Sequence, residues 1–405
     1  MLFDINEFLE AVSNVLDVIE TDIFGVPTNH SKRIAYFSNR IACELKLSEE
    51  IRYDLAALSI LHDNGASLKI LHDNLLGNAK SKQNIVESRK EHCMIGESNI
   101  SSFPFLTNPH NIVLNHHEKF DGSGFFGLSG SEIPLMAQLI NLVDTLDLQF
   151  DLGNIYKNID AEIRIIEFIN NNSGTAFGEN IVDAALVAIS KNGFWEDLCD
   201  EKIDGSLRDL IPVHKRVMAY KAIHNITKIF SKIIDAKSEF TEHHSSGLTK
   251  SLGIMAKHYK IEGDTYWKMK IASDLHDLGK LGISNSILDK PGALTAEEFN
   301  IIKEHPETAK RCLEKVEGFS DISEWAYNHH EKLDGSGYPR GLKAINLDFN
   351  SRLLTCLDIY QALSEIRPYR NAMAHADAMT IMRQMVSGGL IDFDITEDID
   401  LVLGK

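Results

Sequence analysis

A repeated string of histidines and aspartates constrains this chain more than any other feature of its sequence. Its members are His244, His276, Asp277, His305, His329, His330 and Asp358 in the second half, and His30, His62, Asp63, His92, His116, His117 and Asp144 in the first. Corresponding members lie 213 or 214 residues apart, and ten of the 17 histidines belong to the pattern. Chance does not place seven such residues in the same order twice. We therefore expect a tandem repeat of a metal-binding unit.

The length and the residue pattern predict two helical domains. A chain of 405 residues is long for one core, and the repeat suggests domains at 1–205 and 206–405, with the junction between Gly193 and Pro212. Apolar residues recur with helical spacing after His30 and after His244, and no alternating run is long enough for a sheet. We expect an all-α fold, with helices at about 5–20 and 213–237 leading into the two strings and glycine-rich loops at 121–124 and 334–337.

Charge and composition exclude several classes of partner. A formal net charge of −18 disfavours duplex nucleic acid and an anionic membrane surface, because both require basic patches. The five cysteines lack CxxC spacing and suggest reduced, mostly buried thiols, rather than a disulfide framework or a zinc cluster. No signal peptide and no spanning apolar segment is apparent, so we expect a cytoplasmic protein.

The residue types in the string suit a dinuclear metal site. Imidazole and carboxylate without thiolate fit iron, manganese or zinc, and leave the identity of the metal open. Adjacent helix residues point about 100° apart, so His276 can hold one ion while Asp277 bridges two. Lys280, four residues after His276, would lie on the same helix face, within reach of a phosphate on the ions. Ions ~3.5–4 Å apart would keep positions open for water and substrate. His243 could trade places with His244, but His244 is in register with His30 and is preferred.

Several runs in the second half resemble the HD-GYP phosphodiesterases. These runs are His276-Asp277-Leu278-Gly279-Lys280, Lys290-Pro291-Gly292, His305-Pro306, His329-His330-Glu331-Lys332-Leu333-Asp334-Gly335-Ser336-Gly337-Tyr338-Pro339 and Arg367-Pro368-Tyr369-Arg370. The likeness is close from about Lys237 to Arg370, and the intact Gly-Tyr-Pro makes it highly specific. The first half resembles a divergent copy. The resemblance implies two tandem all-helical HD domains.

The resemblance also implies an activity and roles for individual residues. It implies hydrolysis of a bacterial cyclic dinucleotide, cyclic di-GMP or 3′3′-cyclic GMP-AMP, to a linear 5′-phosphorylated dinucleotide. The second string would bind two divalent ions, most often iron or manganese in the family, because the glutamate that serves a third ion is replaced by Phe240. Asp277 and Lys280 would be catalytic. The residues expected to contact substrate are Lys280, Asp334, Gly337, Tyr338, Pro339, Arg340 and Arg367.

The first half keeps every candidate ligand but loses the surrounding cations. Ala66 stands where the second half has Lys280, Phe125-Phe126 replace Tyr338-Pro339, and Arg340 has no counterpart. A lysine on a phosphate contributes about 1.5–3 kcal/mol, or roughly one to two decades of affinity or rate. We expect a second candidate metal site in the first domain with little or no activity, and a role in structure, dimerisation or regulation.

Two other functions stay open at the level of sequence. The chain could be a signalling or scaffold module that binds a nucleotide without turnover, or another HD-superfamily nucleotide phosphohydrolase. Asp334 with its flanking glycines could equally form a simple turn. The preferred dinucleotide, the input signal and the oligomeric state are undetermined, with a homodimer as one candidate assembly.

Overall fold

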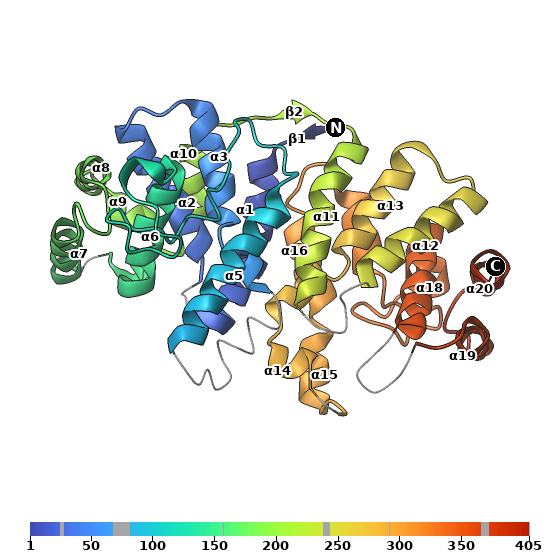
Figure 1. The fold of residues 1–405 in the computed structure, drawn as a ribbon. Helices are drawn as coiled ribbons and strands as arrows, with labels where there is room; N and C mark the ends of the chain where they lie inside the picture. Colours follow the sequence, from blue (N-terminus) through green and yellow to red (C-terminus); the bar gives the residue numbers. More distant parts are fainter. Residues whose placement is uncertain are drawn as a thin grey trace. The chain divides into compact units, whose positions relative to one another are not determined.

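The computed structural model describes residues 1–24, 28–67, 82–156, 158–237, 244–290, 292–365 and 372–404, and they are predominantly helical (Figure 1). The expected all-α fold is confirmed. The chain forms two compact units, Asp4–Arg216 and Val217–Lys405, and the second unit also includes Met1–Phe3. The division falls after Arg216, later than the boundary at 205 expected from the sequence, because helices continue through the glycine-containing stretch before it.

The N-terminal unit contains helices and short 3-10 turns. In chain order they are α1 (Ile5–Phe24), α2 (His30–Glu44), α3 (Glu49–Ile60), η1 (Asn64–Ser67), α5 (Lys82–Ile100), η2 (Gly130–Glu132), α6 (Leu135–Phe150), η3 (Leu152–Asn154), α7 (Ile159–Asn171), α8 (Glu179–Ile189), α9 (Phe194–Asp197) and α10 (Ile203–Leu210).

The C-terminal unit repeats the order of the elements that carry the string. Its elements are α11 (Tyr220–Ala236), α12 (His244–His258), α13 (Gly263–Leu275), η4 (Leu278–Gly282), α14 (Asn285–Leu288), α15 (Ala296–Ile302), α16 (His305–Leu313), α17 (Ser320–Tyr327), η5 (Ala344–Asn346), α18 (Phe349–Ser364), α19 (His375–Ser387) and α20 (Phe393–Leu403).

One helix lies at the centre of each unit and begins with the first histidine of its string. Helix α2 packs against α3, α6, α8 and α10, and α12 packs against α13, α18 and α20. The helical periodicity expected after both histidines is confirmed, because Ile34, Phe37, Leu248, Leu252 and Met255 are all fully buried. Burying such apolar faces fixes the central helices, and with them the first ligand of each string.

Capping groups define where several helices of the site region begin. Ser48 accepts a hydrogen bond from the Ile51 amide at the start of α3. Thr295 and Glu298 form a capping box at the start of α15. Asp348 caps α18 by accepting from the Ser351 amide at 2.8 Å. Each cap satisfies amides that the first helical turn leaves without partners, and so sets the register of the residues that follow.

The first residues of the chain belong to the C-terminal unit. Strand β1 (Leu2–Phe3) pairs with β2 (Arg216–Val217), a two-residue pairing that the sequence did not predict. The Met1 nitrogen donates to the Met218 carbonyl at 2.9 Å. The Phe3 ring stacks on Phe319 with 5.9 Å between centroids. Among the described residues, none of the helices is both long enough and apolar enough to span a bilayer.

Candidate metal centres

The structure brings all seven members of the second string together from five segments. His244 begins α12, His276 caps α13 with Asp277 next to it, and His305 begins α16. His329 and His330 follow α17, and Asp358 lies in α18. Their ligand atoms form three overlapping groups, with all atoms of a group within 4.8 Å of one another: His244, His276 and Asp358; His276, Asp277 and His329; His305, His329 and His330.

The Asp277 carboxylate joins these groups. Its Oδ1 lies 3.3 Å from Nε2 of His305 and 3.8 Å from Nε2 of His329. Its Oδ2 lies 3.3 Å from Nε2 of His276. One oxygen therefore faces each side of the cluster, which is the arrangement expected of a bridging ligand.

Asp358 closes the other side of the cluster. Its Oδ1 lies 3.0 Å from Nε2 of His244 and 3.8 Å from Nε2 of His276. Its Oδ2 lies 3.9 Å from Nδ1 of His330. The carboxylate thus touches the first and the last histidine of the string, although 114 residues separate it from His244.

Backbone carbonyls orient three of the imidazoles. Nδ1 of His276, His305 and His329 lies 2.8, 2.7 and 2.6 Å from the carbonyl three residues earlier. Each Nδ1–H can donate to that carbonyl, which leaves the Nε2 lone pair directed into the cluster. Among the described residues, the buried Nε2 of His276 and Oδ1 of Asp277 have no hydrogen-bond partner. Buried atoms of this kind are rare, and a cation between them would satisfy both, so the residues fit the implied metal ions.

The electrostatics of the cluster favour the ligand-competent forms of His305, His329 and Asp277, but favour the protonated form of His244. Burial lowers the pKa of His305 to about 3 and that of His329 to about 4, so both imidazoles are neutral near pH 7. Burial opposes the ionised form of Asp277, but His276 and Lys280 outweigh it and hold its pKa well below the usual range. Burial also disfavours charge on His244, yet hydrogen bonds to Asp358 and Glu365 raise its pKa to about 10. Divalent metals bind neutral imidazoles and ionised carboxylates, so an ion held by His244 would have to displace its proton.

Lys280 lies at the edge of the cluster, but in a different local structure from the one that was expected. The sequence predicted an α-helical spacing between His276 and Lys280, but α13 ends at Leu275 and Lys280 lies in the 3-10 turn η4. Its Nζ donates to Oδ2 of Asp277 at 2.7 Å, and a quarter of the side chain is exposed. The ammonium therefore lies both on the bridging carboxylate and at the solvent edge.

Two glycines that follow the His-Asp pairs allow a close approach that the sequence analysis did not identify. A Cβ atom at Gly279 would collide with the backbone of His305, and one at Gly65 would collide with the backbone of His92. Only glycine allows the 3-10 turn to come this close to the next histidine of the string. The sequence did contain a sign of this close approach, because each glycine stands two residues after the aspartate of its His-Asp pair.

Glu331 holds the glycine-rich loop from inside. It belongs to the sequence run that resembles the family, but no role was predicted for it. Its carboxylate is buried and accepts from the Arg340 amide at 2.7 Å and from the Leu342 amide at 2.9 Å. In the first half Glu118 accepts from the amides of Phe126 and Leu128 at 2.5 and 2.7 Å. The loop is thus anchored identically in both units, although it is one residue shorter in the first.

The structure places the predicted substrate residues at different distances from the cluster. Tyr338 packs on His330 with 4.8 Å between ring centroids. Asp334 is exposed and accepts from the Ser336 amide at 2.9 Å, so it caps a turn. Arg340 donates to Glu324 and, at 2.6 Å, to Asn328.

Other predicted positions are constrained by the loop backbone or cannot be placed. A Cβ atom at Gly337 would collide with Glu331 and Lys332, and Pro339 continues the same loop. Arg367 with the rest of its motif, Pro291, Phe240 and His243 lie outside the described residues.

The first string forms a cluster with the same plan. Asp63 Oδ1 lies 3.2 Å from Nε2 of both His92 and His116, and Oδ2 lies 3.6 Å from Nε2 of His62. Asp144 lies 3.3 Å from His30, 4.0 Å from His62 and 3.8 Å from His117. Nε2 of His62 and Oδ1 of Asp63 are again buried and have no hydrogen-bond partner in the described part of the chain. All seven members therefore converge in this unit as well.

The surroundings of this first cluster differ from those of the second. Ala66, in place of Lys280, is fully buried. The Phe125 ring takes the place of Tyr338 and lies 4.9 Å from the His117 ring. Cys93 joins His92, His116 and His117 in one group of ligand atoms. Among the described residues, this cluster thus has a thiol beside it, whereas its unit lacks a counterpart of Lys280.

A buried ion pair supports the first ligand of the N-terminal unit. Asp147 contacts Nδ1 of His30 at 2.6 Å and accepts from Nε of Arg33 at 2.9 Å, and all three side chains are buried. Arg33 also donates to Asp200 at 2.9 Å. The equivalent positions in the C-terminal unit are Gly247 and Gln361, whose side chain fills the space beside that glycine. Sequence reasoning missed this pair, because nothing marked Arg33 as buried.

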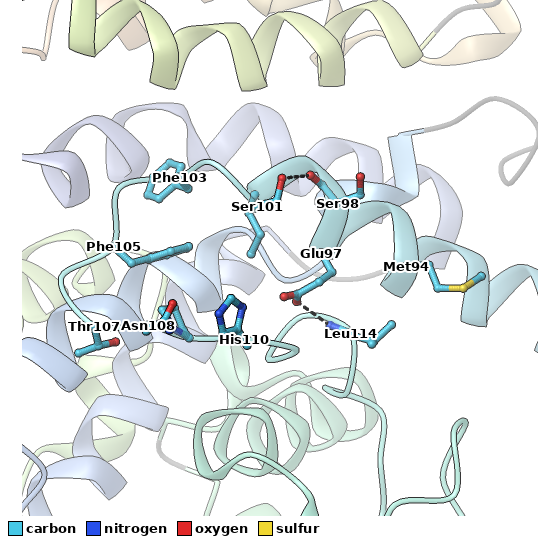
Figure 2. A pocket seen from close by; sticks show the side chains of 12 residues that line it. Met94, Glu97, Ser98, Ser101, Phe103, Phe105, Thr107, Asn108, His110 and Leu114 are labelled. Atoms are coloured by element: carbon cyan, nitrogen blue, oxygen red, sulfur yellow. Dashed lines mark hydrogen bonds between the residues drawn. The ribbon is translucent and has the colours of Figure 1, made fainter.

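A separate surface pocket of about 460 Å³ lies beside the end of α5 (Figure 2). Its lining includes Met94, Glu97, Phe105 and His110, and it contains no member of either string. Glu97 is engaged there by the Asn111 and Leu114 amides at 2.8 and 3.1 Å. The pocket therefore lies on a face of α5 other than the one that carries His92.

Comparisons with known proteins agree with this geometry. A family model described as HD domain matches residues 21–181 and 228–395. The chain is 31% identical over 390 residues to 3′3′-cGAMP-specific phosphodiesterase 1 of Vibrio cholerae serotype O1, covering 95% of this chain and 88% of that protein. It is 27% identical over 430 residues to 3′3′-cGAMP-specific phosphodiesterase 3 of the same organism, covering 94% and 91%.

A shorter match and a solved structure complete these comparisons. A cyclic di-GMP phosphodiesterase of Thermotoga maritima is 31% identical over 179 residues, which is 43% of this chain and 48% of that protein. A crystal structure of a cyclic GMP-AMP specific phosphodiesterase from V. cholerae aligns over 100% of this chain and 98% of that one, with a TM-score of 0.66 and 23% identity. This last likeness shows a shared fold.

Proposed function

This chain belongs to the HD-GYP family of cyclic dinucleotide phosphodiesterases, and we propose that its C-terminal unit hydrolyses a 3′3′-cyclic dinucleotide to a linear dinucleotide with a 5′-phosphate. One observation supports this proposal most directly. The buried carboxylate of Asp277 faces histidines on both sides and also holds the ammonium of Lys280. Such a cluster combines two cation positions with a fixed positive charge at its solvent edge.

The residues of the cluster divide into two binding positions. His244, His276 and Asp358 would hold one divalent ion, and His305, His329 and His330 would hold the other, with Asp277 shared between them. When bound, the ions would supply Lewis-acid stabilisation of an anionic phosphodiester and a low pKa for water. The donor set of nitrogen and oxygen is compatible with iron or manganese, which the family resemblance implies, and two ions are proposed.

The remaining residues of the site bind and orient the substrate in this proposal. Lys280 presents its ammonium to a phosphate oxygen while it stays anchored on Asp277. Tyr338 packs on His330 and forms one wall beside the second ion position. Glu331 holds the loop that carries Tyr338, so the wall keeps its place as substrate enters and leaves. These roles are assigned from position and chemistry.

In this proposal, only the C-terminal unit hydrolyses the substrate. The N-terminal unit, residues 4–216, keeps its ligands but offers buried Ala66 where a phosphate would need a cation. Buried, uncompensated phosphate charge is costly. We propose that this unit serves structure or regulation instead of turnover, and that a homodimer is one assembly in which it could act.

We further propose 3′3′-cyclic GMP-AMP as the preferred substrate. The two relatives described above that match more than nine tenths of the chain are both named as specific for this dinucleotide. The cyclic di-GMP phosphodiesterase of T. maritima matches less than half of the chain. The match to these two relatives thus extends over both units of this chain, which favours the same substrate class.

A substrate panel with paired variants tests the proposal. The full chain, loaded with iron or manganese, is incubated with 3′3′-cyclic GMP-AMP, cyclic di-GMP and cyclic di-AMP, and linear products are separated by chromatography. His276→Ala with Asp277→Ala should abolish product, whereas His62→Ala with Asp63→Ala should leave most of it. Hydrolysis that survives the first pair would refute the assignment to the C-terminal unit. Bound metal without any hydrolysis would instead favour a binding or scaffold module.

A further inference from the structure

We propose that the N-terminal unit contains a four-ligand zinc site of different chemistry from the C-terminal centre, formed by His92, Cys93, His116 and His117. Their ligand atoms, including the Cys93 sulfur, all lie within 4.8 Å of one another. Zinc and cobalt(II) accept mixed thiolate and imidazole sets, whereas the C-terminal groups of the described residues contain nitrogen and oxygen only.

Two separations between the ligand atoms match those around one small tetrahedral ion. Cys93 Sγ lies 3.4 Å from Nε2 of His92, and the Nε2 atoms of His92 and His116 are 3.5 Å apart. Around tetrahedral zinc, with bonds of roughly 2.3 Å to sulfur and 2.0–2.1 Å to nitrogen, neighbouring ligand atoms lie about 3.3–3.6 Å apart. These two separations therefore fit such an ion, and the remaining ligand atoms lie within 4.8 Å of one another.

Local structure directs the thiol and the imidazoles inward. Cys93 is fully buried and His92 is 1% exposed, both on α5, whereas the next residue, Met94, is half exposed and lines the surface pocket (Figure 2). His116 is oriented by its Nδ1, which lies 2.6 Å from the Val113 carbonyl. This contact leaves Nε2 of His116 for the ion.

An independent observation also points to a cation at this place. Oδ1 of Asp63 is buried, has no hydrogen-bond partner among the residues that the structure describes, and lies 3.2 Å from Nε2 of both His92 and His116. Nε2 of His62, on the other side of Asp63, also has no hydrogen-bond partner among them. Polar atoms this deeply buried are normally satisfied, and a cation bound at this cluster would satisfy both.

The C-terminal unit shows what the thiol changes. By register the residue equivalent to Cys93 is Pro306, which has no ligand atom, so the position beside His305, His329 and His330 has one protein ligand fewer than its N-terminal counterpart. A catalytic site needs a free coordination position for water or substrate, and an additional protein ligand such as the Cys93 thiolate would occupy it. The N-terminal site is therefore a stabilising centre, in keeping with the loss of the lysine at Ala66.

Cobalt substitution tests the proposal on the full chain with a readout independent of turnover. The protein is stripped of metal, reconstituted with cobalt(II), and examined for the near-ultraviolet charge-transfer absorption that a thiolate–cobalt bond produces. We expect this band in the parent chain, its loss in Cys93→Ser, and its persistence in Cys199→Ser, a matched control whose cysteine lies in neither cluster. Zinc affinity, measured by competition with a chromophoric chelator, should fall at least about tenfold in Cys93→Ser only.

Three results of these measurements would overturn the zinc site. Cobalt bound to the parent chain without the charge-transfer band overturns the proposal, and this measurement requires no variant to fold. A band that survives in Cys93→Ser, or zinc affinity equal in the two variants, also overturns it. Far-ultraviolet circular dichroism of Cys93→Ser confirms that a lost band reflects a lost ligand and not an unfolded domain.

Discussion

The ammonium of Lys280 lies 2.7 Å from Oδ2 of Asp277, the same carboxylate whose other oxygen faces His305 and His329. The charge that can bind a phosphate is thus attached to the carboxylate shared by the two ion positions. Removal of this charge should weaken substrate binding and also change the environment of the bridging ligand.

Replacement of Lys280 by methionine should lower kcat/KM for the cyclic dinucleotide by about one to two decades, since a charge-assisted contact contributes about 1.5–3 kcal/mol. Lys280→Arg should recover part of the activity. Steady-state kinetics on metal-loaded protein measure this. Lys268→Met, which removes the surface ion pair with Asp321, is the matched control and should behave like the parent. Equal kinetics for Lys280→Met and the control would contradict a role for Lys280.

Tyr338→Phe should keep most of the activity, whereas Tyr338→Ala should reduce kcat/KM by about tenfold. The reason is that the ring, and not the hydroxyl, packs on His330, and Phe125 takes the equivalent position on His117. An aromatic contact of this kind contributes about 0.5–1.5 kcal/mol beyond its buried area. A large loss in Tyr338→Phe would instead show that the hydroxyl acts on the substrate.

Glu331→Gln should loosen the glycine-rich loop and lower activity, because its buried carboxylate holds two backbone amides. The expected loss of stability is about 1.5–3 kcal/mol, from weaker hydrogen bonds to those amides. Limited proteolysis between residues 331 and 342 and the phosphodiesterase assay measure both effects. The matched variant Glu118→Gln should loosen the N-terminal loop and leave hydrolysis intact. Loss of activity in both variants would show that the two loops are coupled.

Removal of metal should lower the melting temperature as well as abolish hydrolysis. Buried atoms such as Nε2 of His276 and Oδ1 of Asp277 would be left without partners, and a ligand that binds only the folded state stabilises it by mass action. Differential scanning calorimetry with chelator, followed by manganese or iron, measures the shift. Full recovery of the melting temperature without recovery of turnover would argue against the proposed catalytic role of these ions.

Arg33→Met should destabilise the N-terminal unit by about 3–5 kcal/mol, because Asp147 would remain buried without the guanidinium that pairs with it. Burial alone would raise the pKa of Asp147, but His30 and Arg33 keep it lowered. The double variant Arg33→Met with Asp147→Asn should be more stable than the single one. Denaturant titration measures both. A single variant as stable as the parent would exclude a structural role for this pair.

The sequence predicted the fold class and the membership of both clusters, but not the supporting contacts. Histidines and aspartates in matching order identify ligands, because metal chemistry restricts which residues can occupy those positions. Glu331, Gly279 and Arg33 act through backbone amides, close approach and a buried ion pair. Their partners are distant or are backbone atoms, so no spacing rule marks them in the chain.

Two sequence-based interpretations were limited by local geometry. The α-helical spacing assumed for Lys280 was wrong, because the helix ends at Leu275 and a 3-10 turn follows. The cysteines were dismissed as a group because they lack CxxC spacing, yet Cys93 lies beside three histidines in space. Adjacent residues on one helix and residues from a following loop produce that proximity.

The pairing of Met1 with Met218 has a consequence for the order of folding. These two residues are 217 positions apart in the sequence, yet the Met1 nitrogen lies 2.9 Å from the Met218 carbonyl. Closing a loop of this length costs entropy before its contacts form, so Leu2 and Phe3 are expected to dock late in folding. Phe3, although joined directly to the unit that starts at Asp4, therefore contributes its stacking on Phe319 to the stability of the other unit.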